Sequence, residues 1–101
     1  MYQKKEMHSG LEEFRSTPNA LLGDVRNPSE YDAGHIPVSM NFAMSRVLQE
    51  AEEAFPDKGQ PLFVYCQSGA RSARAGKLLD LLGYESVTDL GGIASYIGPK
   101  E

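Results

Sequence analysis

The stretch Leu62-Phe63-Val64-Tyr65-Cys66-Gln67-Ser68-Gly69-Ala70-Arg71-Ser72 decides the fold of this chain. It begins with an apolar run, residues 62–65, that is typical of a strand buried in a parallel sheet. From residue 73 onward apolar residues recur at helical spacing, and Gly83 stands where a left-handed helix cap belongs. The sequence therefore predicts a buried strand, a loop over residues 66–71 and then a helix.

The loop between this strand and helix favours a reactive cysteine. It opens with Cys66, the only cysteine of the chain, and Gly69 allows several backbone N–H groups to converge on one point. A helix N-terminus carries a partial positive charge, and Arg71 and Arg74 add two full charges with no acid before Asp80. Such surroundings lower the pKa of a thiol. A buried cysteine without chemistry is the alternative, but the position at the end of the strand favours a thiolate and a small anionic substrate.

Four segments in the same order and spacing resemble a known family, the single-domain rhodaneses, which are sulfurtransferases. The resemblance covers about residues 11–97. Its segments are Leu22–Arg26, which ends in Asp-Val-Arg; Glu30–Pro37, which matches Glu-Tyr-x-x-Gly-His-Ile-Pro; Cys66–Ser72, which matches Cys-x-x-Gly-x-Arg-Ser; and Leu90–Ile93, which contains Gly-Gly-Ile.

Strand-like and helix-like segments alternate along the chain, which predicts an α/β fold with a mostly parallel sheet. At 101 residues the chain has room for one domain, which we expect over residues 1–101. The resemblance implies a three-layer fold in which about five short strands are flanked by helices. It also implies a short edge strand within residues 2–7.

Helix signals lie outside the central stretch as well. The spacing from Ser9 to Glu12 is that of a capping box, which predicts a helix start there. Asn27 followed by Pro28 and Glu30 predicts a second, short helix, and a terminal helix is expected over residues 93–97.

Two positions depart from the pattern of the family. Gly23 stands within a strand where the family usually has a large apolar residue, which indicates a weakened strand or close packing. Val38-Ser39 replaces the Gly-Ala that commonly follows His-Ile-Pro, and this change affects the geometry of the local turn.

The resemblance implies a reaction through a persulfide on Cys66, with sulfur taken from thiosulfate or a related donor and passed to cyanide or a cellular thiol. A persulfide-carrying protein is a further candidate donor or acceptor. The loop Gln67, Ser68, Gly69, Ala70, Arg71 and Ser72 would hold the persulfide. Arg71 would orient the anionic donor and Arg74 would help to steer it. The reaction requires no metal and no organic cofactor.

Three other polar residues are candidate supporting groups. Asp24 and Arg26 follow a predicted strand, so they belong at the carboxyl edge of the sheet where ligands of such folds bind. His35 lies between Gly34 and Ile36 and could serve as a general base. Because a preformed thiolate needs no base, we expect His35, Asp24 and Arg26 mainly to brace neighbouring loops.

Other functions are compatible with a reactive cysteine. Cysteine phosphatases have five residues between Cys and Arg, whereas this loop has four, Gln67–Ala70, which is too small a ring for a tetrahedral phosphoryl group. The spacing therefore argues against phosphatase and arsenate-reductase activity. Rhodanese-like domains without turnover usually lack the cysteine. A sulfur carrier for a protein partner and a thiol sensor of oxidants stay open as alternatives.

The composition limits the possible binding partners of the chain and the cellular compartment in which we expect it. The net charge of −4 argues against binding to nucleic acid or to an anionic membrane. A single cysteine excludes an intrachain disulfide and fits a reducing compartment. The sequence shows no apolar segment typical of a signal peptide or a membrane span, so we expect a cytoplasmic protein.

Overall fold

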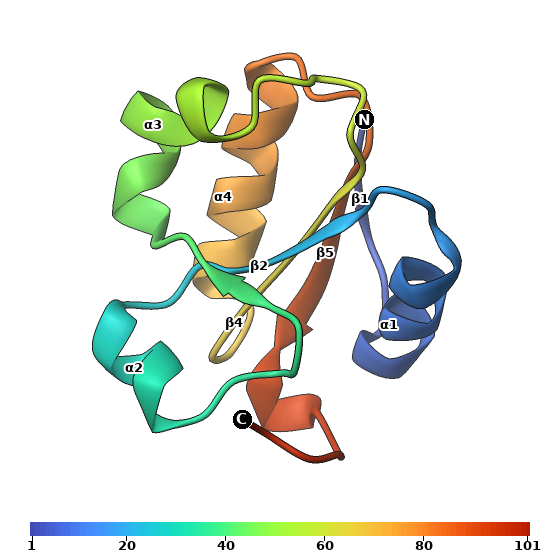
Figure 1. Cartoon of the computed structure of the whole chain (residues 1–101), viewed down its shortest axis with the longest axis vertical. Helices are drawn as coiled ribbons and strands as arrows, with labels where there is room; N and C mark the ends of the chain where they lie inside the picture. Colours follow the sequence, from blue (N-terminus) through green and yellow to red (C-terminus); the bar gives the residue numbers. More distant parts are fainter.

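A computed structural model describes residues 1–101, and its centre is a sheet of five strands that are all parallel (Figure 1). The strand order is β1-β5-β4-β2-β3, so β1 lies at an edge and β4 in the middle. The strands are β1 (Tyr2–Lys4), β2 (Leu21–Asp24), β3 (Met40–Asn41), β4 (Leu62–Cys66) and β5 (Val87–Gly92). The expected α/β fold, its parallel sheet and its N-terminal edge strand are confirmed.

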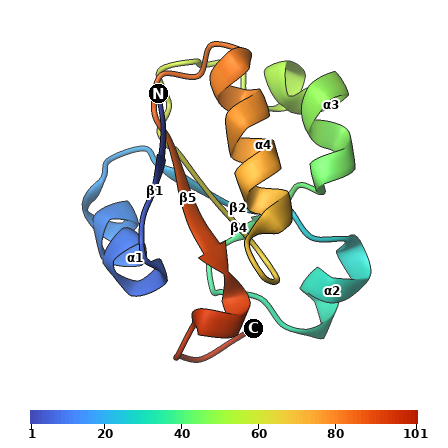
Figure 2. The same cartoon turned by 180° about the vertical axis from the view of Figure 1, so that it is seen from behind.

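Helices cover both faces of this sheet, which gives the three layers that were expected (Figures 1 and 2). The helix α1 (Met7–Ser16) lies on one face, and α3 (Val47–Ala54) and α4 (Ala70–Leu81) lie on the other. The short α2 (Pro28–Ala33) lies beside the carboxyl ends of the strands. Two single turns, η1 (Met44–Arg46) and η2 (Ile93–Ser95), complete the fold. None of the helices has both the length and the apolar character that a bilayer-spanning segment needs.

The central strand β4 divides its side chains between two hydrophobic cores. Phe63 and Tyr65 pack in the core under α1, while Leu62, Val64 and Cys66 pack in the core under α3 and α4. All five residues are buried, as expected for a central strand of a parallel sheet. The alternation of side chains along a strand thus places Cys66 on the side of the sheet from which α4 begins.

Three predicted helix boundaries were wrong. The helix α1 begins at Met7, because the carboxylate of Glu6 accepts hydrogen bonds from the backbone N–H groups of His8 and Ser9 at 2.8 and 3.0 Å. A residue outside the Ser-Gly-Leu-Glu pattern therefore caps the helix. The helix α4 begins at Ala70, so Arg71 belongs to its first turn and not to the loop. The expected helix over 93–97 is the single turn η2.

The two departures from the family pattern have different consequences. Gly23 is accommodated within β2, and a β-carbon there would lie 3.7 Å from the carbonyl oxygen of Phe63, an ordinary contact. It borders an apolar cavity of about 20 Å³, so Gly23 leaves a small packing gap and not a close approach. Val38, in contrast, has a φ angle of +66°, in the left-handed region that disfavours β-branched residues.

We expect Val38→Gly to raise the free energy of unfolding by about 1 kcal/mol, because the strain at a β-branched residue exceeds the entropy that glycine adds to the unfolded chain. The side chain of Val38 is 77% exposed, so little packing is lost. Thermal unfolding should show a melting temperature higher by about 4–8 °C. Val38→Ala keeps the β-carbon and should raise the free energy of unfolding by less than Val38→Gly does. A melting temperature that falls in Val38→Gly would contradict this account.

Candidate active site

The sulfur of Cys66 lies at the junction of β4 and α4, where backbone donors converge on it. The backbone N–H of Gly69 donates to Sγ at 3.0 Å, and Oγ of Ser72 lies 3.5 Å from Sγ. Gly69 precedes the first residue of α4 and has a φ angle of +107°, a conformation that only glycine adopts without strain. The residue is nearly inaccessible, with 1% of Cys66 exposed.

Burial and hydrogen bonding act on the Cys66 thiol in opposite directions. Burial raises its pKa, because a buried thiolate loses hydration. The hydroxyl of Ser72 and the backbone N–H groups of Ser72, Gly69 and Ser68 lower it, because they stabilise the negative sulfur. Hydrogen bonding prevails, so the pKa of Cys66 is lower than that of an ordinary thiol. The predicted thiolate is thus supported by specific donors.

The end of β5, Gly91 and Gly92, forms the second wall of the cradle, by which we mean the residues that surround the Cys66 sulfur. The Ser72 hydroxyl, which has a single proton to donate, also lies within hydrogen-bond distance of the carbonyl oxygens of Gly69 and Gly91, at 3.2 and 3.4 Å. A β-carbon on Gly92 would overlap the carbonyl oxygen of Gln67 and come within 2.7 Å of the Ser68 Cα. The Gly-Gly-Ile motif is visible in the sequence, but no local pattern predicts its contact with the Cys66 loop. These glycines allow β5 to touch the loop.

Arg71 is held by an acid that sequence analysis did not include among the site residues. Its guanidinium donates to both carboxylate oxygens of Glu30 on α2, at 2.6 and 2.9 Å. The pKa of Glu30 falls to about 2, first because of this pair and then because its carboxylate accepts from the Asn27 N–H at 3.0 Å. Glu30 lies in the quoted Glu-Tyr-x-x-Gly-His-Ile-Pro segment, so the sequence contains the motif, but it does not show that Glu30 pairs with Arg71.

Arg74 is not brought together with the cradle. It lies on the exposed side of α4, one turn beyond Ala70, and its side chain makes no hydrogen bond or ion pair. Its role in steering a donor stays a prediction.

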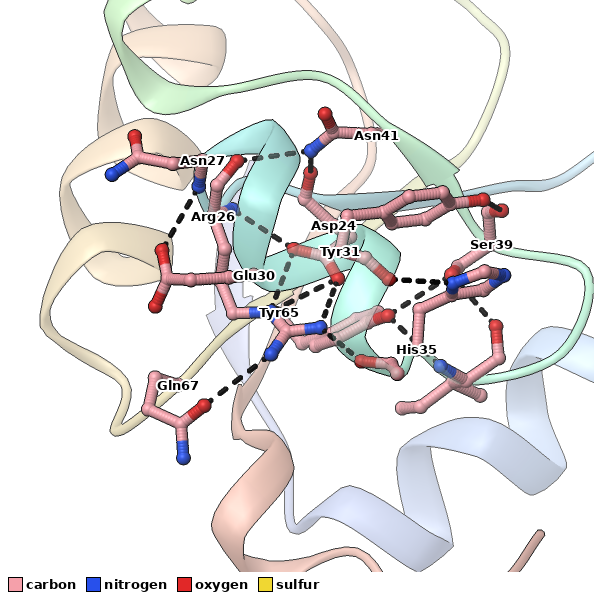
Figure 3. Close-up of polar contacts among 12 residues, drawn as sticks. Asp24, Arg26, Asn27, Glu30, Tyr31, His35, Ser39, Asn41, Tyr65 and Gln67 are labelled. Atoms are coloured by element: carbon pink, nitrogen blue, oxygen red, sulfur yellow. Dashed lines mark hydrogen bonds and ion pairs between the residues drawn. The ribbon is translucent and has the colours of Figure 1, made fainter. Parts of the chain in front are cut away.

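Asp24 and Arg26 form a buried ion pair beneath the loop (Figure 3). The guanidinium of Arg26 donates to both oxygens of Asp24, with the shortest distance 2.7 Å, and the Arg26 backbone N–H also donates to Asp24. The same guanidinium reaches the Gly34 carbonyl oxygen at 2.7 Å and the Gln67 side-chain oxygen at 3.3 Å. These contacts connect the end of β2, the end of α2 and the loop, as expected of a brace.

His35 interacts with α2 and the C-terminal residues, and it makes no hydrogen bond to Cys66 or its loop. Its ring stacks on Tyr31 with the ring centroids 3.7 Å apart, and its Nδ1 lies 2.9 Å from the Tyr31 carbonyl oxygen (Figure 3). Its backbone exchanges two hydrogen bonds with Glu101. The geometry is that of a structural residue, and no contact favours a general base.

Several known proteins are similar to this chain in sequence or in fold. Thiosulfate sulfurtransferase PspE of Escherichia coli (strain K12) is 34% identical over 77 residues, which are 76% of this chain and 74% of that protein. Thiosulfate:glutathione sulfurtransferase of Saccharomyces cerevisiae (strain ATCC 204508 / S288c) is 37% identical over 82 residues, 70% of this chain and 59% of that protein. A solved structure of a rhodanese with anions from E. coli has a TM-score of 0.74 and 32% identity, and covers 81% of this chain and 96% of its own.

A family model for the rhodanese-like domain matches residues 7–98. The match includes the Cys66 loop, the Asp24–Arg26 pair and the two glycines that end β5. The chain therefore belongs to the family of rhodanese-like domains, as a transferase of the rhodanese type.

Proposed function

We propose that this chain moves a sulfane sulfur from thiosulfate, or a related anionic donor, to cyanide or a cellular thiol through a persulfide on Cys66. The observation that carries the proposal is the position of Cys66 Sγ, 3.0 Å from the Gly69 N–H at the start of α4 and with a lowered pKa. The names of the relatives support the same reaction class. A reducing compartment such as the cytoplasm would keep this single thiol reactive.

The proposed reaction has two displacement steps. In the first, the Cys66 thiolate attacks the outer sulfur of thiosulfate, the sulfur–sulfur bond of thiosulfate breaks, and sulfite leaves with the bonding electron pair. The persulfide keeps one negative charge, which the N–H groups that faced the thiolate stabilise without rearrangement. In the second step cyanide or a thiolate attacks the outer sulfur, and the Cys66 thiolate is regenerated.

Arg71 would contribute as a donor-orienting cation at the mouth of the cradle. The ion pair with Glu30 fixes its guanidinium, and its side chain keeps 36% of its surface exposed. Only one hydrogen-bond donor on each terminal nitrogen is used by Glu30, so others are free for an anion. Glu30 would then act as a positioning residue.

Wild-type protein incubated with thiosulfate should gain the mass of one sulfur, and cyanide or a thiol should remove it. Cys66→Ser should gain nothing, because the chain has no other thiol. Intact-mass measurement without reductant checks both. The proposed function is wrong if the wild type takes up no sulfur while Cys66 still reacts with an alkylating agent.

Ser72→Ala should raise the pKa of Cys66, because a hydroxyl that stabilises the thiolate is lost. The rate of alkylation by iodoacetamide, measured against pH, reports the pKa, since the thiolate reacts and is lost as the pH falls. Ser68→Ala is the matched control, because Ser68 contributes its backbone N–H and its side chain is exposed. Equal shifts in both variants would contradict a role for the Ser72 hydroxyl.

Arg71→Ala should lower kcat/KM for thiosulfate by about tenfold, because the dianionic donor loses a charged hydrogen-bond partner. Most of this loss should come from a higher KM and not from a lower kcat. Alkylation by neutral iodoacetamide at a pH where Cys66 is fully ionised should stay within about threefold of the wild type. If both reactions slow equally, Arg71 supports the loop and does not bind the donor.

A further inference from the structure

The outward side of α4 carries an open depression of about 340 Å³ that the reaction proposed above does not use. We call this surface the α4 face. It is lined by Ala70, Ala73, Arg74, Lys77, Leu78 and Leu81. Figure 2 shows α4 in front of the sheet, with the loop that follows β4 at one end of the helix.

The charge of the α4 face is opposite to that of the protein as a whole. Five of the ten Lys and Arg residues form ion pairs with side-chain carboxylates, and Arg74 and Lys77 are not among them. They stand three residues apart on one side of the helix, both exposed. A chain with a net charge of −4 thus presents two adjacent unpaired cations at this surface.

The same surface also exposes apolar area. Leu81 is 81% exposed at the end of α4, and Leu78 beside it is only partly buried. A single exposed leucine is ordinary on a protein surface. Here it lies in one depression with two cations and two alanines, a combination that fits a partner with an apolar side chain among acidic ones.

The α4 face begins next to the candidate active site. Ala70 directly follows Gly69, whose N–H donates to Cys66, and the face extends about 17 Å from Ala70 to Leu81 at the rise of an α-helix. Cys66 itself is only 1% exposed. A partner seated along α4 would hold its own reactive sulfur at the mouth of the cradle without entering it.

We propose that the α4 face is the docking surface of an acidic partner protein that exchanges sulfur with Cys66. Its acidic side chains pair with Arg74 and Lys77, and an apolar side chain contacts Leu78 and Leu81. The role of the complex rests on the proposed persulfide reaction. Transfer then breaks the bond between the two persulfide sulfurs, as the partner's thiolate attacks the outer one and Cys66 leaves as a thiolate.

Two synthetic peptides test the docking surface. One is short and contains a cysteine and a leucine among glutamates, and its twin has glutamines in place of the glutamates. Each is titrated into the isotope-labelled Cys66→Ser protein, so that binding is read by NMR without any sulfur chemistry. The acidic peptide should shift the amide signals of residues 70–81 and bind at least about tenfold tighter than its twin, and added salt should reduce the difference.

Lys77→Glu combined with Leu81→Ser should weaken binding of the acidic peptide by about tenfold. The matched control is Arg15→Glu with Leu48→Ser, which also reverses one positive charge and removes one exposed leucine, but at positions outside the α4 face. This control should bind the acidic peptide within about twofold of the parent. The proposal is overturned by equal binding of the two peptides, by shifts located away from α4, or by equal losses in the two double variants. Shifts on α4 that grow with protein concentration alone would assign the face to a second copy of this chain and overturn it too.

The persulfide reaction is measured separately by intact mass on wild-type protein. Binding of the acidic peptide without sulfur uptake would leave the docking surface standing and remove the proposed function. Sulfur uptake without a preference for the acidic peptide would remove the docking surface alone.

Discussion

The convergence of N–H groups on one buried sulfur is the interaction on which the rest of the structure depends. A buried thiolate is costly, because it loses hydration, and only donors fixed in advance can replace that hydration. In the proposed thiolate form of Cys66, the N–H groups of Ser68, Gly69 and Ser72 would replace the lost hydration, and they would act strongly because water is excluded. The buried strand β4, the helix that starts at Ala70 and the glycines at the end of β5 each fix one side of this cradle.

The charged residues around the cradle divide into two groups by burial. Asp24 and Arg26 are buried and form an ion pair with each other, so their contribution is to hold neighbouring loops together. Removing one member of such a pair leaves a buried charge without a partner, which costs more than the intact pair contributes. Arg71 and Glu30 are paired but half-exposed, so the guanidinium keeps donors that face solvent. In the proposed reaction, the second pair is therefore the one that would meet the anionic donor.

Local sequence patterns predicted strands, turns and helix starts correctly where a single physical effect acts. The apolar run 62–65 became a central strand, Gly83 took a positive φ angle, and Asn27 preceded the helix α2. The predictions failed where two signals compete. Glu6 caps α1 in place of Ser9, and α4 begins at Ala70, within the residues predicted as a loop.

The sequence by itself determined the parallel α/β fold, the position of Cys66 at the end of a central strand and the basic residues that follow it, because hydrophobic periodicity, glycine and charge are local properties. Only the tertiary structure decided which residues meet there. Glu30 and Arg71 are 41 positions apart, and Gly92 reaches Gln67 across the gap between β5 and the loop. Such contacts depend on how strands and helices pack, which local patterns do not encode.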